Sequence, residues 1–296
     1  MARFGRVLTA MVTPFDANGA VDFDTARDLA RWLVAHGNEG IVVAGTTGEA
    51  PTLADDEHLD LIEAVVQAVD VPVVAGTGGN DTAHSIYMTE QATLRGAAAV
   101  LVVCPYYNRP PQSGIAAHMR AVAGATHLPV MVYDIPIRTG RKISTDTLLG
   151  LARDVPNIVA LKDAAGNPGE TTVLIAGAPD GFEVYSGDDA MTLPLLAAGA
   201  VGVVGVATHW TGDDHQELFA LWDKGDTAAA RAVNARLLES FAFETSDEAP
   251  NPIPTKAMMR HLGLPVGHAR LPIGPGPDWV DARAAEVHAN LVGARG

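Results

Sequence analysis

Lys162 is the residue of this chain best suited to covalent chemistry. It is one of four lysines and directly follows the apolar run 157–161, whereas Lys142, Lys224 and Lys256 occupy loop or helical contexts. Desolvation at the end of such a run lowers the pKa of an ammonium group and raises the fraction of neutral amine. A neutral amine can attack a carbonyl carbon and form a Schiff base. The alternative is a lysine whose side chain extends into solvent and pairs with a nearby aspartate.

Tyr133 and Arg138 follow the preceding apolar run and could assist the same chemistry. The Tyr133 phenol could transfer protons during imine formation. Alternatively, the ring could have a purely structural role and close the end of the barrel. Arg138 lies in the segment IRTG at 137–140. Its guanidinium could hold a carboxylate through two parallel hydrogen bonds, or it could be a solvated loop arginine.

The segment GTTGE at 45–49 has the composition of an anion-binding loop. Its glycines let the backbone approach a ligand closely, and the hydroxyls and consecutive amides of Thr46 and Thr47 could hold a carboxylate. No two of the ten histidines have metal-ligand spacing, and the adjacent acids Asp188 and Asp189 are more typical of loop capping than of a cation site. We therefore expect neither a metal nor a cofactor.

Eight short apolar runs, separated by helix-length amphipathic segments, must position these side chains. Runs rich in valine and isoleucine, apolar almost throughout, are typical of parallel strands buried on both faces. Eight successive strand–helix units predict an α/β fold of the (β/α)8 TIM-barrel type, in which chemistry occurs at the carboxyl ends of the strands. The alternative fold is an open doubly wound sheet, but no GxGxxG segment follows the first apolar run. The predicted strands are Val7–Val12, Gly40–Ala44, Val71–Ala75, Ala98–Val103, Pro129–Tyr133, Ile158–Lys162, Phe182–Tyr185 and Gly202–Val206.

The last quarter of the chain has a different pattern. From about Gly212 onward it is helical, with proline-rich interruptions at 250–254 and 272–277. We expect residues 1–225 to form the barrel and residues 226–296 a C-terminal helical extension packed on it.

Composition excludes several classes of protein. Of 296 residues, 48% are hydrophobic and 19% charged, which argues against intrinsic disorder. The net charge of −15 argues against a nucleic-acid surface or attachment to an anionic membrane. A single cysteine cannot form a disulfide within the chain, and the sequence shows no signal peptide or long apolar run. We therefore expect a soluble, cytoplasmic protein.

Six motifs occur in one order along the predicted barrel and together resemble a known family. It is the pyruvate-dependent, Schiff-base-forming barrel family that includes the dihydrodipicolinate synthases and N-acetylneuraminate lyases. The two threonines, the tyrosine pair and the arginine resemble the synthases more than the lyases. The motifs are GTTGE at 45–49, CPYYNRP at 104–110, YDIPIRTG at 133–140, the strand-end Lys162, SGDD at 186–189 and NPIPTK at 251–256.

The resemblance implies a role for each matching residue. Lys162 would condense with the keto carbon of pyruvate, and Thr46 and Thr47 would hold its carboxylate, largely through their amides. Tyr133, Thr47 and Tyr107 would form a proton relay, with Tyr107 supplied by a neighbouring subunit of a homotetramer arranged as a dimer of dimers.

The resemblance also implies a second substrate and a pathway. Arg138 would bind the carboxylate of L-aspartate-4-semialdehyde, and Gly187 and Val204 would line the pyruvate pocket through their backbones. The product would enter diaminopimelate and lysine biosynthesis. This sequence departs from the family pattern at Asp134, where asparagine is more common, and at Gly205, where serine is common.

Two other functions remain open on the sequence. One is a pyruvate-dependent aldolase that cleaves a 2-keto-3-deoxy acid or N-acetylneuraminate. The other is a non-catalytic protein that binds small molecules with the same fold, because a fold does not fix a function.

Overall fold

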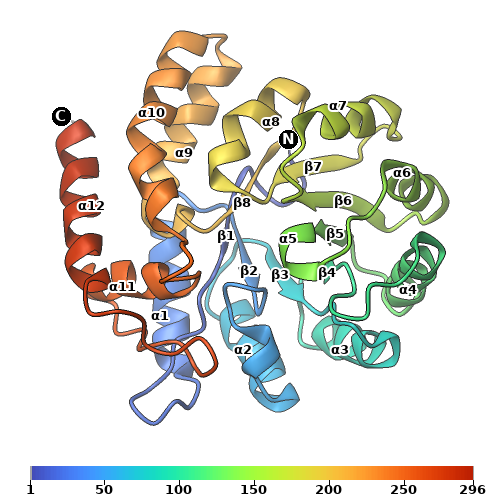
Figure 1. Cartoon of the computed structure of the whole chain (residues 1–296). Coiled ribbons are helices and arrows are strands. Elements are labelled where there is room, and N and C mark those ends of the chain that lie inside the picture. Colours follow the sequence, from blue (N-terminus) through green and yellow to red (C-terminus); the bar gives the residue numbers. More distant parts are fainter. Residues whose placement is uncertain (1, 296) are drawn as a thin grey trace.

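Eight parallel strands close into a barrel in the computed structural model, which describes residues 2–295 (Figure 1). Each strand pairs with its neighbours in sequence, and β1 pairs with β8 to complete the ring. All eight predicted strands are present, with ends within two residues of the expected ones, so the predicted TIM barrel is confirmed. The strands are β1 (Val7–Ala10), β2 (Gly40–Val43), β3 (Val73–Gly76), β4 (Ala99–Val103), β5 (Val130–Asp134), β6 (Ile158–Asp163), β7 (Glu183–Ser186) and β8 (Gly202–Gly205).

The helices between the strands form a ring outside the barrel (Figure 1). Side-chain caps mark where several of them begin: Asp22 accepts a hydrogen bond from the Thr25 amide, and Ser144 accepts one from the Thr147 amide. These helices are α1 (Phe23–Ala35), α2 (Asp55–Val66), α3 (Thr82–Leu94), α4 (Gln112–Gly124), α6 (Thr145–Asp154), α7 (Pro168–Gly177), α8 (Thr192–Ala198) and α9 (Thr208–Asp223), with short 3₁₀ turns at Ala50–Thr52 (η1) and Asp189–Met191 (η2). The short helix α5 (Pro136–Thr139) instead lies over the end of the barrel (Figure 1).

Alternation along the strands decides which side chains point into the barrel. Successive residues of a strand face opposite sides, so Met131 and Tyr133 of β5 share the inner face with Ala160 and Lys162 of β6. Met131, Tyr133 and Ala160 belong to one buried apolar cluster inside the barrel. The remaining core lies between the strands and the surrounding helices.

The C-terminal extension packs on one side of the barrel (Figure 1, orange to red). It comprises α10 (Thr227–Phe243), α11 (Ile253–His261) and α12 (Val280–Arg295). The expected division at residues 225 and 226 falls in the turn between α9 and α10, and one hydrophobic cluster extends across it.

The prediction for residues 250–254 was wrong in one respect. The second half of this proline-rich stretch begins α11, and Pro254 lies in its first turn. Proline is tolerated there because its missing N–H would have had no partner within the helix. No helix within residues 2–295 is long and apolar enough to span a bilayer.

Candidate active site

Lys162 and Tyr133 are neighbours across the β5–β6 pair, as the sequence predicts. Their Cα atoms are register partners, and both side chains are 4% exposed. The Lys162 Nζ lies 4.4 Å from the centroid of the Tyr133 ring. The amine and the phenol therefore occupy the same space at the carboxyl ends of neighbouring strands, where barrel enzymes perform their chemistry.

Lys162 does not form the ion pair that the alternative interpretation required. Within the described part of the chain, no carboxylate oxygen lies within 4.0 Å of its Nζ. Asp163 points to the other face of β6, where its carboxylate accepts hydrogen bonds from Thr171 and from the Ala165 amide. Asp188 caps the η2 turn by accepting from the Ala190 amide.

Burial sets the charge state of Lys162. Desolvation lowers the pKa of its amine to about 8, and the negative charges of Asp189 and Glu244 partly oppose this shift. The charge on Arg138 lowers the pKa slightly further. A substantial fraction of the amine is therefore neutral near physiological pH, as a Schiff-base nucleophile requires.

Tyr133 remains a neutral phenol at physiological pH. Burial raises its pKa to about 12, while a hydrogen bond with the side chain of Thr46 acts in the opposite direction. A neutral phenol next to a hydroxyl can both donate and accept a proton.

The GTTGE loop presents its backbone in the way an anion site requires. No acceptor within residues 2–295 faces the amides of Thr46 and Thr47. The residues flanking them, Ala44 and Glu49, have φ values of 54° and 57°, in the left-handed region that residues with a Cβ rarely adopt. Backbone strain of this kind concentrates at functional sites.

The two threonines differ in where their hydroxyl groups lie. Thr46 lines the cavity beside Tyr133. Thr47 is buried, and its Oγ1 accepts a hydrogen bond from the Asn251 side-chain amide at 2.9 Å. The resemblance implies Thr47 as the relay hydroxyl, whereas Thr46 is the threonine that lines the cavity with the phenol.

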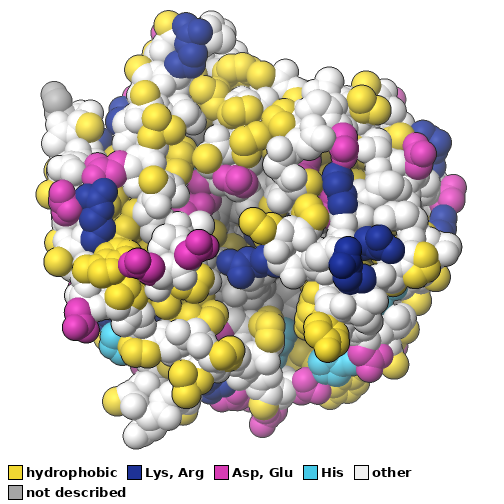
Figure 2. Space-filling view, viewed as in Figure 1, with side chains coloured by type: hydrophobic (Ala, Val, Ile, Leu, Met, Phe, Trp, Pro, Cys, Tyr) yellow, Lys and Arg dark blue, Asp and Glu magenta, His cyan; other side chains and the backbone are white. Residues whose placement is uncertain are grey.

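A cavity of about 240 Å³ opens at this end of the barrel. Figure 2 shows charged side chains around the centre of this face of the molecule. Lys162 does not line the cavity but lies one layer deeper, against the Tyr133 ring. Tyr133 is thus the contact between the cavity and the amine. The lining includes Gly45, Thr46, Tyr106, Tyr133, Ile135 and Arg138.

Tyr107 lies outside this arrangement. Its side chain is 89% exposed, and its φ of 70° is in the left-handed region. The structure of one chain therefore brings Lys162, Tyr133, Thr46 and Arg138 together and leaves Tyr107 on the surface.

Gly187 borders Lys162, and Val204 lies in the barrel interior. A Cβ added to Gly187 would lie 2.9 Å from the Lys162 Cγ, so only glycine lets this turn pack against the lysine stem. Val204 of β8 is fully buried in the same inner cluster as Tyr133.

Gly205, where the family commonly has serine, packs against Asp189 of the η2 turn. A Cβ at this position would collide with the Oδ1 of Asp189, whose Oδ2 accepts a hydrogen bond from the Val206 amide at 2.7 Å. Glu244, which follows α10, accepts one from the Ala207 amide at 3.2 Å. Burial and the nearby charge of Asp189 raise the pKa of Glu244 well above its ordinary value.

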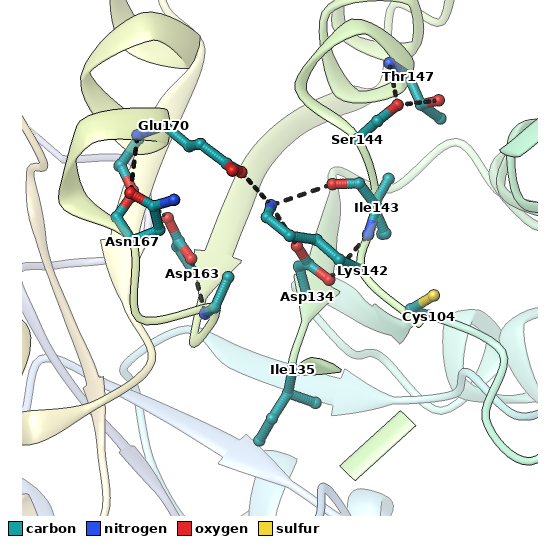
Figure 3. Close-up of polar contacts among 12 residues, drawn as sticks. Cys104, Asp134, Ile135, Lys142, Ile143, Ser144, Thr147, Asp163, Asn167 and Glu170 are labelled. Carbon is teal, nitrogen blue, oxygen red and sulfur yellow. Dashed lines mark hydrogen bonds and ion pairs between the residues drawn. The ribbon is translucent and has the colours of Figure 1, made fainter. Parts of the chain in front are cut away.

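The side chain of Asp134, where the family more often has asparagine, does not face the cavity. Figure 3 shows Lys142 between Asp134 and Glu170, with Ile135 pointing the other way. The Lys142 Nζ lies 3.2 Å from Asp134 and 3.0 Å from Glu170, and the Ile143 amide donates to Asp134 at 3.1 Å. The acidic residue is therefore neutralised behind the strand, on the side away from Lys162.

Sequence reasoning missed a second buried lysine. Lys256 lies in α11, a helical context as the sequence predicts, but it is 1% exposed and its Nζ lies 2.6 Å from the Oε1 of Glu49. It also donates to the carbonyl of His268. The motifs GTTGE and NPIPTK contained both partners, but no sequence signal joined two segments 200 residues apart.

Comparisons with known proteins agree with this geometry. Residues 3–286 match the family model described as the dihydrodipicolinate synthetase family. A 4-hydroxy-tetrahydrodipicolinate synthase of Symbiobacterium thermophilum is 50% identical over 291 residues, covering 98% of both chains.

Solved structures give the same result. A dihydrodipicolinate synthase from Cyanidioschyzon merolae with lysine bound is 41% identical and superposes with a TM-score of 0.96, covering 99% of both chains. One from Acinetobacter baumannii, complexed with pyruvate, is 34% identical with a TM-score of 0.92, covering 98% of this chain and 99% of the other. With a strand-end lysine, a neighbouring phenol and full-length matches of this kind, the chain belongs to the dihydrodipicolinate synthetase family.

Proposed function

We propose that this protein is a lyase that condenses pyruvate with L-aspartate-4-semialdehyde to give 4-hydroxy-tetrahydrodipicolinate, within diaminopimelate and lysine biosynthesis. The observation that carries the proposal is the buried Lys162 amine, which has no carboxylate oxygen within 4.0 Å in the described chain and lies 4.4 Å from the centroid of the Tyr133 ring. Relatives with 46–50% identity over nearly the whole chain bear the name of this synthase. A cytoplasmic location is part of the same proposal.

The chemistry begins at the neutral amine of Lys162. It attacks the keto carbon of pyruvate, and loss of water leaves a protonated imine that withdraws electrons from the adjacent methyl group. Removal of a methyl proton gives an enamine, whose carbon attacks the aldehyde of the second substrate and regenerates the imine. The amino group of that substrate then adds to the imine carbon, which closes the ring and releases the Lys162 amine. Orientation of the two substrates and proton transfer share the reduction of the barrier.

The pyruvate carboxylate binds to the unpaired amides of Thr46 and Thr47. Gly187 and Val204 line the same pocket through their backbones. This placement sets the keto carbon toward Lys162, beside the Tyr133 ring.

Protons move through the phenol of Tyr133. The resemblance implies Thr47 as the next member of the relay, but its hydroxyl faces Asn251 and does not line the cavity, whereas Thr46 lines the cavity beside the phenol. We therefore assign the next position to Thr46. Tyr107 completes the relay from a neighbouring subunit, a role supported by its exposed side chain and strained backbone. This assignment requires an oligomer, which we propose is a homotetramer arranged as a dimer of dimers.

Arg138 binds the carboxylate of the semialdehyde. Its side chain lines the open end of the cavity, and a guanidinium matches the geometry of a carboxylate. Asp134 does not disturb this site, because Lys142 neutralises it on the outer side of β5.

Substrate exchange tests the proposal. We expect product formation from pyruvate only when aspartate semialdehyde is present, followed in an assay coupled to the next reductive step. Cleavage of a 2-keto-3-deoxy acid or of N-acetylneuraminate, without a semialdehyde-dependent product, would instead identify an aldolase.

A further inference from the structure

The motif NPIPTK has no role in the chemistry described above, yet it contacts the GTTGE loop directly. The Asn251 side-chain amide donates to the Thr47 Oγ1 at 2.9 Å, and Lys256 pairs with Glu49 at 2.6 Å. The amide of Arg270 donates to the Oε2 of Glu49 at 2.8 Å. The C-terminal extension therefore holds the anion-binding loop at two places.

We propose that Asn251 is a positioning residue for the pyruvate site, which fixes Thr47 through its hydroxyl and thereby aims the amides of Thr46 and Thr47 at the substrate carboxylate. This inference rests on the proposed function, because it concerns binding of the same substrate. It assigns a part of the site to a segment outside the eight strand–helix units.

The hydrogen bonds around Asn251 define which end of its amide faces the loop. The Thr255 hydroxyl donates to the Asn251 Oδ1 at 3.3 Å, so the carbonyl oxygen is occupied and the NH₂ group points to Thr47. The contact excludes water, since Asn251 is 7% and Thr47 2% exposed. A hydrogen bond in such surroundings is stronger than one in solvent and leaves a costly unpaired group when one partner is removed.

The two attachments have different consequences for the loop. Lys256 neutralises Glu49, which lies beyond the two threonines, and so stabilises the left-handed turn. Asn251 acts on Thr47 itself, whose amide is one of the two free donors. Loss of Asn251 should therefore change pyruvate binding more than it changes overall stability.

A double-mutant cycle between Asn251 and Thr47 tests the proposal. We expect Asn251→Ala to raise the KM for pyruvate roughly 10-fold, within the range of coupling between contacting residues, with little change in the KM for the semialdehyde. In a Thr47→Val background, which already lacks the acceptor, the same substitution should have almost no further effect. His261→Ala, at an exposed position at the end of the helix α11 that follows Asn251, serves as the control and should leave both constants unchanged.

Several outcomes would overturn the inference. Independent effects of the two substitutions, or an equal change in both KM values, would mean that Asn251 acts only on general stability. If Asn251→Ala does not fold, Thr47→Val alone decides, because it removes the same hydrogen bond, and an unchanged pyruvate KM would contradict the proposal. Failure of the proposed function is distinguishable, because the unmodified protein would then give no semialdehyde-dependent product.

Discussion

Lys162 and Lys256 are two buried lysines of this chain that share several properties but differ in their partners. Both are at most 4% exposed, and burial lowers the pKa of each to about 8. Each ammonium also lies over an aromatic ring, 4.4 Å from the Tyr133 centroid and 4.1 Å from that of Phe15. Burial and aromatic contact therefore do not distinguish a nucleophile from a structural cation.

The partners distinguish them. Lys256 pairs with Glu49 at 2.6 Å and donates to the His268 carbonyl, so its charge holds two segments together. Lys162 has no carboxylate within 4.0 Å in the described chain and lies beside a phenol at a cavity. The unpaired amine can lose its proton without breaking an ion pair, which suits it to nucleophilic attack.

The largest expected effect is on activity, from Lys162→Met. We expect the turnover of pyruvate and semialdehyde to fall by at least ~10³-fold, because the nucleophile is absent while the fold persists. The coupled assay measures this loss, and circular dichroism shows whether the barrel is intact. Lys224→Met, at an exposed position directly after α9, is the control and should retain most activity. Substantial turnover by Lys162→Met would contradict the assignment.

The difference between the two lysines also marks what the sequence could provide. The strands and Lys162 could be predicted because short apolar runs and their ends are local features. The burial of Lys256 could not be predicted, because it depends on Glu49, which lies in a loop 207 residues earlier in the chain. The same limit applies to Thr46 and Thr47, whose hydroxyl directions depend on Tyr133 and Asn251.

The second effect is on stability, from Lys256→Met. Removing the cation leaves Glu49 buried without its partner, which should lower the free energy of unfolding by about 3–5 kcal/mol. Urea denaturation measures the change. Glu49→Gln combined with Lys256→Met should recover much of the loss, because no buried charge then remains. A single variant as stable as the unmodified chain would show that the ion pair contributes little.

Lys162→Met should change stability in the opposite direction. The folded-state pKa of Lys162 is lowered to about 8, so burying its charged form opposes folding below that pH, and this cost disappears as pH rises toward the unfolded value of 10.5. We expect the variant to be about 1–3 kcal/mol more stable than the unmodified chain at pH 7, with a smaller difference near pH 10. Urea denaturation at the two pH values provides the comparison. A variant that is less stable at pH 7 would contradict the unpaired state of Lys162.

The smallest effect is on the pH profile. The neutral fraction of an amine with a pKa of about 8 rises roughly 10-fold between pH 7 and pH 9, so kcat/KM for pyruvate should rise over the same interval. The combined Glu49→Gln and Lys256→Met variant should keep this acidic limb, since Lys256 takes no part in the chemistry. Loss of the rise in kcat/KM in that variant would show that the titrating group is Lys256 and not Lys162.

Trapping of the pyruvate imine tests most directly whether Lys162 is the nucleophile. The protein is incubated with pyruvate, reduced with borohydride, digested and analysed by mass spectrometry. We expect one reduced pyruvyl group on the peptide that contains Lys162 and none on the peptide that contains Lys256. The absence of any adduct, or an adduct on Lys256, would contradict this role of Lys162.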